Sequence, residues 1–441
     1  MKTLRLVLAL VAALASAAFL APPPPPMQRM PGRTPVVFWH MWSGEWQPVV
    51  ETICRRFNES QSEYEVIPLS IPPAGAESKF LCGASGGDVP DLVSQWNPVL
   101  GMWTERGLIQ PIENVMTPEE KAQFLREAFP IIRKHAVYDG KVMAIIGGVD
   151  VGAVFYRLDH LAEIGLDARH LPKSLEELAE VGRKLDRYDA NGRLRRVGFL
   201  PQSLMDLVPS FGGGFGTGKQ MAFDTPENLR ALEFIVGNLR RVGFDKVTRF
   251  AASQAADAGV NAPMISGNYS ILIDGQWRVK QIAQFAPHLP YVVAPIPPPR
   301  GGLPSASMSG PNYMVIPAKA KHAKGAWAFL KYWIGFTDPE AGAQGIVEMG
   351  WLPYSRKVAE APSYQKYLRD NPQYKTFVDL MASPNLATPP ISPMQSFVMN
   401  EIQKANDVAV RGTQTPREAL AGLEAAVRTE SERQRRLGNV R

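Results

Sequence analysis

Cysteine and histidine are scarce in this chain, with two and six copies among 441 residues. The histidines form no H-E-x-x-H pattern and no close pair at metal-ligand spacing, so the sequence disfavours a metalloenzyme. Cys54 and Cys82 fall on two predicted helices, and they either form a disulfide, if these helices are adjacent, or are buried thiols. We expect no metal and no cofactor.

A complete nucleotide-binding loop is also lacking, although residues 211–220, FGGGFGTGKQ, contain most of one. The phosphate-binding pattern ends in Lys and then a hydroxyl residue that holds magnesium, whereas Gln220 follows Lys219 here. The pattern also requires a strand before the loop and a helix after it, and the flanking PQSLMDLVPS and MAFDTPEN predict neither. We interpret the segment as a glycine-rich turn.

A strong charge of one sign is missing as well. The formal net charge of +6 is spread over the whole chain, which is too mild to indicate a nucleic-acid partner. The C-terminal RTESERQRRLGNVR interleaves acidic and basic residues, which is typical of a solvated helix end.

The N-terminus carries the one long apolar run, MKTLRLVLALVAALASAAFLA, after two early positive charges. The run is short for a membrane span and contains a small-x-small site at Ala15-Ser16-Ala17, so residues 1–21 predict an export signal. Residues 22–34 are proline-rich and predict an extended stalk. No cysteine lies near the signal for lipid attachment. We expect a periplasmic or extracytoplasmic protein, tethered to the membrane if the signal is not cleaved.

Strand and helix patterns alternate after the stalk. Strands are predicted over 34–42 and 64–71, and a third strand follows a turn within 86–96, with a helix over 46–60 and a short helix around Phe80 between them. This order is typical of a parallel α/β sheet. A second unit follows, with capped helices that begin at Ser174 and Thr225, further strands within 193–201, 264–277, 291–299 and 312–318, and a mainly helical end whose last helix begins at Thr415.

Nine segments, taken in order, carry a family resemblance over about residues 36–427. They are GGDVPDLV, TERGLIQPI, YDGKVMAI, VFYRLDHLAEIGLD, PKSLEELAE, MISGNYSILIDGQW, YMVIPAKAKHAKGAWAFLKYW, MGWLP and TPREALAGLEAAV. The chain resembles the extracellular solute-binding proteins of carbohydrate ABC importers, family 1, which include maltose-binding and glycerol-3-phosphate-binding proteins.

The resemblance implies an α/β, two-lobed periplasmic binding protein fold of type II, with an interlobe ligand cleft and a hinge. It assigns residues 35–150 and 298–345 to an N-terminal lobe and residues 151–297 and 346–441 to a C-terminal lobe. It further implies a monomer without catalytic residues that delivers a carbohydrate to membrane permease subunits driven by a cytoplasmic ATPase. In that case Lys219 has no phosphate to bind, and FGGGFG is a turn beside the cleft.

A sugar site needs aromatic rings for the apolar sugar faces and short polar side chains for the hydroxyls. Trp277 matches the family tryptophan that stacks on a sugar, and Trp42 follows the first strand, where open α/β sheets bind ligands. Asp150 matches an acidic residue at the interlobe crossing, with a structural carboxylate as the alternative. The other candidates from the resemblance are Glu45 (or a charge at a helix N-terminus), Trp96, Asn97, Gln202, Asn312, Tyr313 and Trp351 (or a packing residue).

Two departures from the family narrow the ligand. The segment SPMQSFVMN offers only Phe397 where the maltose binders have a further stacking tryptophan, so one sugar subsite is missing or reshaped. The same region has no basic residue before Lys404, which disfavours a phosphate ligand. The alternatives are a glycerol-3-phosphate or other small polyol or anion binder, a secreted carbohydrate-active enzyme, and a sensor subunit. Trp327, Phe329 and Trp333 lie on one amphipathic helix and are expected in the core.

Overall fold

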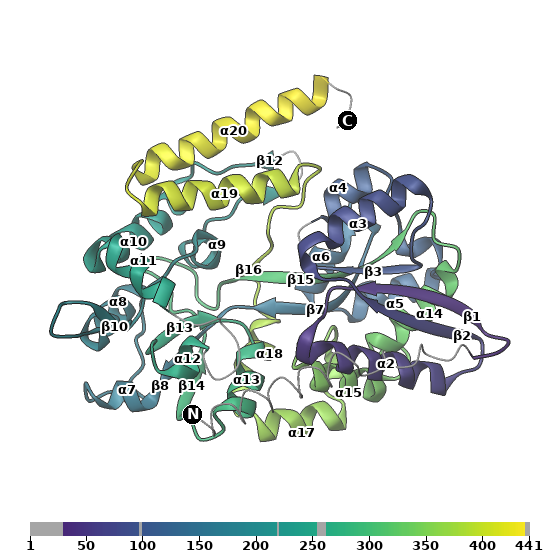
Figure 1. Cartoon of the computed structure of the whole chain (residues 1–441), viewed down its shortest axis with the longest axis horizontal. Helices are drawn as coiled ribbons and strands as arrows, with labels where there is room; N and C mark the ends of the chain where they lie inside the picture. The colour runs from purple at the N-terminus through teal and green to yellow at the C-terminus, as the bar shows by residue number, and fades with distance from the viewer. Residues whose placement is uncertain (1–29, 97–98, 218–219, 254–261, 437–441) are drawn as a thin grey trace, which may run out of the picture.

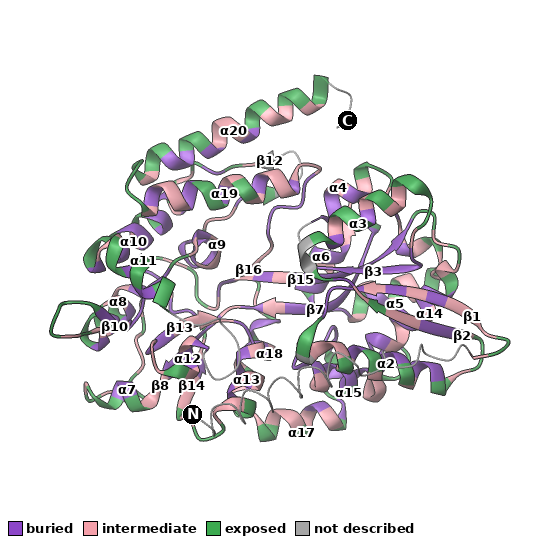
Figure 2. Cartoon of the chain, viewed as in Figure 1, coloured by how far each residue is buried: buried purple, intermediate pink, exposed green. Residues whose placement is uncertain are grey.

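The computed structural model describes residues 30–96, 99–217, 220–253 and 262–436. Figure 1 shows an α/β unit around β1 to β3, a second unit around β8, β13 and β14, and strands β7 and β15 running between them. In Figure 2 the central strands are mostly buried or partly buried, while the outer faces of the surrounding helices are exposed. The order of strands and helices predicted from the sequence is therefore confirmed in outline.

The first lobe is organised by a seven-stranded sheet. Strand β1 (Thr34–His40) runs parallel to β2 (Tyr64–Ser70) on one side and to β3 (Leu92–Gln95) on the other. The long strand β15 (Ser307–Pro317) pairs antiparallel with β3. Strands β4 (Ile109–Gln110), β7 (Ile145–Val151) and β16 (Leu386–Ala387) also pair with β15, and β5 (Val137–Tyr138) pairs with β6 (Lys141–Val142).

Helical segments surround this sheet, and those labelled η are short 3-10 helices. The segments are η1 (Gly44–Trp46), α2 (Gln47–Ser60), α3 (Pro73–Gly86), α4 (Leu100–Glu105), η2 (Ile112–Asn114), α5 (Pro118–Glu127), α6 (Pro130–Ala136), α14 (Ala323–Trp333), α15 (Pro339–Met349), α16 (Arg356–Ala359), α17 (Pro362–Asp370), η5 (Pro372–Tyr374) and α18 (Lys375–Leu380).

The second lobe is built on an antiparallel sheet in which β8 (Ala153–Arg157) lies between β13 (Ile271–Asp274) and β14 (Tyr291–Ala294). Two further pairs are β9 (Arg187–Tyr188) with β10 (Leu194–Arg196), and β11 (Gly216–Thr217) with β12 (Gln220–Met221). Its helices are α7 (Leu158–Ala162), α8 (Leu175–Leu185), α9 (Leu204–Leu207), η3 (Val208–Phe211), α10 (Pro226–Val242), α11 (Phe244–Ser253), α12 (Pro263–Ser266), α13 (Trp277–Phe285), α19 (Gln395–Val410) and α20 (Pro416–Arg436).

Side-chain caps fix where the predicted helices begin. Ser174 accepts a hydrogen bond from the Glu177 backbone N–H at the start of α8. Thr415 and Glu418 exchange two bonds, because the Glu418 N–H donates to the Thr415 hydroxyl and the Thr415 N–H donates to the Glu418 carboxylate. These bonds satisfy N–H groups that have no partner within the helix, so the capping patterns in the sequence mark true boundaries.

Two large hydrophobic clusters fill the interior. The first surrounds the seven-stranded sheet and includes Trp327, Phe329 and Trp333, which confirms their prediction as core residues. The second lies in the other lobe and takes in α19 and α20. Residues 346–386, which we assigned to the C-terminal lobe, contribute buried side chains such as Met349 to the first cluster. The same cluster takes in Phe155, Val279 and Val293 of β8, α13 and β14, so residues 346–386 pack where the two lobes meet.

The glycine segment is a turn, as predicted. The 3-10 helix η3 precedes it and a short β-hairpin follows it, so the strand-loop-helix context of a phosphate loop is missing; Lys219 itself lies outside the described residues. Gly212 ends η3 at a φ of 82°, a conformation that favours glycine. The two cysteines form no disulfide, since Cys54 is a buried free thiol and Cys82 an exposed one.

Candidate functional site: the junction of the two lobes

Strands β1 and β3 end at the same edge of the first sheet, where ligands bind in open α/β folds. At this edge Gln95, the last residue of β3, pairs with Tyr313 of β15, and on the other side of β15 Gly310 pairs with Asp150 of β7. Because neighbouring strands lie about 4.8 Å apart and Tyr313 and Gly310 are three residues apart on β15, Gln95 and Asp150 are separated by about two strand spacings across the sheet and about 10 Å along β15.

Asp150 lies on a strand that crosses between the lobes, where the sequence placed it. Its Oδ1 accepts a hydrogen bond of 2.8 Å from the Gln276 side chain, whose amide also bonds the backbone of Val149 and Val151 at the edge of β7. The pKa of Asp150 is raised to about 6, chiefly by burial and also by nearby Asp274, against the lowering effect of the Gln276 bond. A carboxylate held in this way can accept hydrogen bonds from sugar hydroxyls.

A second carboxylate with the same property comes from α9. Asp206 follows the Ser203 cap of that helix, and burial raises the pKa of Asp206 to about 6. The charge of Asp274 acts on both Asp150 and Asp206, so the three carboxylates lie within electrostatic range of one another. Asp274 itself forms a 2.5 Å ion pair with Arg278, which is 2% exposed and also donates to Gln281.

Trp277 is the first residue of α13 and is partly exposed. Its indole lies against Gly275: a β-carbon on Gly275 would stand 1.9 Å from Cζ3 of the ring. Because the Trp277 side chain is only partly buried, a ligand can reach it. These observations suit the stacking role that the sequence predicts.

Several other predicted residues are buried in the structure, and for Trp351 this is the packing alternative. Trp42 is 2% exposed because its ring stacks on Trp333 at 5.5 Å and packs against Trp351 at 4.9 Å, so Trp42 and Trp351 belong to the first cluster. Tyr313 is 1% exposed, with its ring edge-on to His135. Asn312 is also buried, under Trp351 beside Gly148. These four side chains shape the sheet end but present almost no surface to a ligand.

The remaining predicted residues differ in exposure. Trp96 is 40% exposed, an unusual value for an indole and one that suits a ligand platform. Gln202 is exposed, and its backbone carbonyl is held by the Asn406 side chain at 3.0 Å. Glu45 lies in η1, but its side chain is outside what the structure describes, and Asn97 lies outside the described residues altogether.

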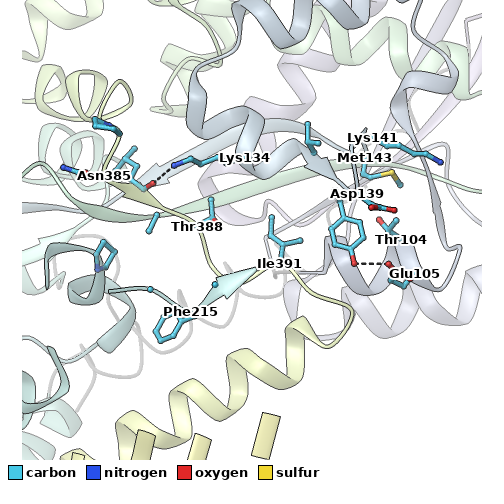
Figure 3. A pocket seen from close by; sticks show the side chains of 18 of the residues that line it. Thr104, Glu105, Lys134, Asp139, Lys141, Met143, Phe215, Asn385, Thr388 and Ile391 are labelled. Atoms are coloured by element: carbon cyan, nitrogen blue, oxygen red, sulfur yellow. Dashed lines mark hydrogen bonds between the residues drawn. The ribbon is translucent and has the colours of Figure 1, made fainter. Parts of the chain in front are cut away.

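A cavity of about 1510 Å³ lies between other parts of the two lobes. Figure 3 shows Thr104, Glu105 and Lys134 of the first lobe facing Phe215 of the glycine turn, with β16 beside them. None of the predicted residues whose side chains the structure describes lines it. Its polar groups are partly engaged, because Lys134 donates to the Leu386 carbonyl and Tyr138 to Glu105.

The glycine turn borders this cavity, and the fully buried side chain of Asn228 holds the turn in place. The Asn228 amide donates to the Gly214 and Phe223 carbonyls and accepts from the Gly214 N–H. A β-carbon on Gly213 would collide with the Asn228 Oδ1, so glycine is required there by close packing. The glycines therefore have a structural reason that involves no phosphate.

Sequence reasoning missed Asp206, Asp274, Gln276 and Trp46 as members of the junction. Gln276 stands directly before Trp277 in IDGQW, and Asp206 follows the candidate Gln202 by four residues. Their closeness in sequence to predicted site residues is the signal that could have identified both. Trp46 gave no signal, since its neighbour Lys280 is 234 positions away.

The junction thus combines paired carboxylates, an amide and partly exposed indoles between two α/β lobes. Within the described residues no group of three or more His, Cys, Asp or Glu side chains could hold a metal ion. Such an arrangement defines a two-lobed solute-binding protein. A family comparison identifies it further: the chain belongs to the bacterial extracellular solute-binding proteins, whose family description matches residues 52–375.

Individual relatives are distant. A maltotriose-binding protein of Pyrococcus abyssi is 22% identical over 391 residues, covering 85% of this chain and 77% of the relative. The sn-glycerol-3-phosphate-binding periplasmic protein UgpB of Shigella dysenteriae is 21% identical, covering 77% and 78%. Among solved structures, CpMnBP1 with mannotriose bound has a TM-score of 0.78 at 22% identity, covering 89% of this chain and 99% of that one. The sugar-binding protein MalE of Xanthomonas citri has a TM-score of 0.72 at 19% identity, covering 92% and 99%.

Proposed function

We propose that this protein binds a neutral carbohydrate outside the cytoplasmic membrane and delivers it, chemically unaltered, to the permease subunits of an ABC importer. The observation that carries the proposal is the junction itself: Gln276, directly before the partly exposed Trp277, holds the Asp150 carboxylate, and Asp274 acts on both Asp150 and Asp206. Carboxylates accept hydrogen bonds from hydroxyls, and an indole covers the apolar face of a sugar ring. Relatives named for maltotriose binding and solved with mannotriose support the same class of ligand.

A glycerol-3-phosphate ligand has less support, although one group of relatives is named for it. A phosphate dianion needs free charge-assisted donors. In the junction the Arg278 guanidinium is already held by Asp274 and Gln281, and the carboxylates nearby would repel an anion. The balance of charge therefore favours an uncharged, hydroxyl-rich ligand.

Location and partners follow from the same proposal. The family is extracellular, and residues 1–21 have the pattern of an export signal. Among the described residues, no helix has the length and apolar composition needed to span a bilayer. We propose export to the periplasm or outer face, a monomeric state, and docking to a permease. Tethering depends on whether the signal is cleaved.

Isothermal titration calorimetry of the protein without residues 1–21 tests the binding proposal. Malto- and manno-oligosaccharides of two to four units form the test panel, and glycerol-3-phosphate is the comparison ligand. We expect at least one oligosaccharide to bind, and the Trp277→Ala variant to bind it more weakly by about 1–3 kcal/mol, as for other stacked aromatic rings. Binding of the phosphate alone would reject the carbohydrate proposal, and turnover of an oligosaccharide would reject a purely binding role.

A further inference from the structure

A lysine on α13 contacts elements of the first lobe beside the proposed ligand site. Lys280 lies on α13, which follows β13 of the second sheet. Its Nζ is 4.7 Å from the centroid of the Trp46 ring in the loop after β1, and the same ammonium donates to the Glu348 carbonyl of α15. The contact joins chain segments that are 234 and 68 residues apart.

The partners of Lys280 are well suited to hold a cation. The carbonyls in the last turn of a helix lack partners within the helix and carry partial negative charge, so the C-terminus of α15 attracts an ammonium. Gly350 follows that helix at a φ of 65° and has no side chain, which leaves room for the lysine stem. A β-carbon on Gly350 would be 3.1 Å from Lys280 Cδ. The face of the Trp46 indole supplies a further attraction.

These partners belong to the first lobe. Trp46 packs against the first hydrophobic cluster, and α15 contributes Ile346 and Met349 to the same cluster. The Glu348 carboxylate pairs with Arg56 of α2 at 2.6 Å, which ties the end of α15 to the first lobe. Helix α13 contributes Val279 and Ile282 to this cluster as well, so it lies where the two lobes meet. Lys280 connects this helix, which follows β13 of the second sheet, to the loop after β1 of the first sheet.

We propose that Lys280, Trp46 and the C-terminus of α15 form an interlobe clasp that stabilises the closed arrangement of the two lobes. Lys280 acts as a positioning residue for ligand binding, since it follows Trp277 by three residues and both move with α13. This inference rests on the proposed function, because closure of the lobes retains the ligand. The contacts of Lys280 with Trp46 and α15 themselves involve no ligand.

Small-angle X-ray scattering of the ligand-free protein tests the clasp directly. Lys280→Met keeps the apolar stem and removes the charge, and we expect a larger radius of gyration than in the wild type. Lys246→Met is the matched control, because Lys246 lies over the Tyr188 ring at 5.4 Å within the second lobe alone. Lys280→Arg, which preserves both the cation and the donor, should restore the wild-type radius.

Binding kinetics give a second readout once a sugar has been identified. Loss of the clasp should raise koff by about fivefold, in line with a modest cation–π energy, while kon changes little. If Lys280→Met does not fold, Trp46→Leu removes the other partner and should have the same effects. Scattering and koff that match the wild type in a folded variant would overturn the clasp. Failure of every sugar to bind would reject the proposed function, and the clasp would still be judged by scattering.

Discussion

Replacing Gly275 with alanine offers a sharp test of the site, because it perturbs the Trp277 ring without changing that residue. The new β-carbon would stand 1.9 Å from Cζ3, 2.3 Å from Cη2 and 2.4 Å from Cε3 of the indole. Ordinary van der Waals contact begins at 3.4 Å, so the ring must withdraw by about 1.5 Å. The backbone need not be strained, since Gly275 is not among the glycines at positive φ.

A ring displaced by this distance cannot stack on a ligand that the carboxylates still hold in place. We therefore expect Gly275→Ala to lose most of the stacking energy, about 1–3 kcal/mol, which is a 5- to 150-fold rise in Kd. Calorimetric titration with the best-binding oligosaccharide measures the loss, and thermal unfolding of the ligand-free variant checks that the fold is retained.

The matched control is Gly237→Ala. Gly237 lies within α10, and a β-carbon there meets nothing within 4 Å. Alanine in a helix interior is more favourable than glycine by up to about 1 kcal/mol, so this variant should melt slightly higher and bind sugar normally. If Gly275→Ala folds and binds with the wild-type Kd, Trp277 does not contact the ligand and the stacking argument is wrong.

The other predictions address charge, packing and the glycine turn. Lowering the pH from 7 to 5 should weaken sugar binding by up to about tenfold per carboxyl. Asp150 and Asp206 have pKa values of about 6, and a carboxyl group accepts hydrogen bonds from hydroxyls best when it is charged. Because these pKa values are raised in the folded state, the ligand-free protein takes up protons in this interval, and its free energy of unfolding gains from these groups as the pH falls. Sugar affinity and stability, measured by titration and by unfolding at both pH values, should therefore change in opposite directions. Both pH effects should be smaller in Asp150→Asn. Asn228→Ala leaves the Gly214 and Phe223 carbonyls unpaired and should cost about 2–3 kcal/mol in urea unfolding, with little change in Kd for a ligand held at Asp150. Lys219→Ala should leave sugar binding unchanged, and a large loss in titration would reopen the case for a phosphate ligand.

Local sequence patterns predicted the elements well, because strands and capped helices depend on nearby residues. The strand-helix-strand order up to β3 and the Thr415 capping box are of this kind. The position of Asp150 on a crossing strand and of Trp277 after β13 came from the family resemblance, and the structure has both.

Burial of the aromatic residues could not be predicted in the same way. Trp42 stands in a loop after β1, where an exposed ring was a reasonable expectation. Its burial depends on Trp333 and Trp351, which are about 300 positions further along the chain, and no local pattern reports such a contact. The packing partners of residues 346–386 could not be predicted either. A helix pattern shows that one face is buried but not which elements bury it.

Helix α13 explains why ligand binding and lobe closure should be coupled in this protein. Successive helical residues point about 100° apart, so the first turn of α13 can serve several neighbours at once. Trp277, the proposed stacking residue, lies against Gly275, Arg278 is paired with Asp274, and Lys280 reaches Trp46 after β1. Directly before the helix, Gln276 is bonded to the edge of the crossing strand β7. A rigid-body shift of α13 would therefore change the stacking ring, the hinge contact and the clasp together, and a ligand that fixes the ring must favour one position of the hinge.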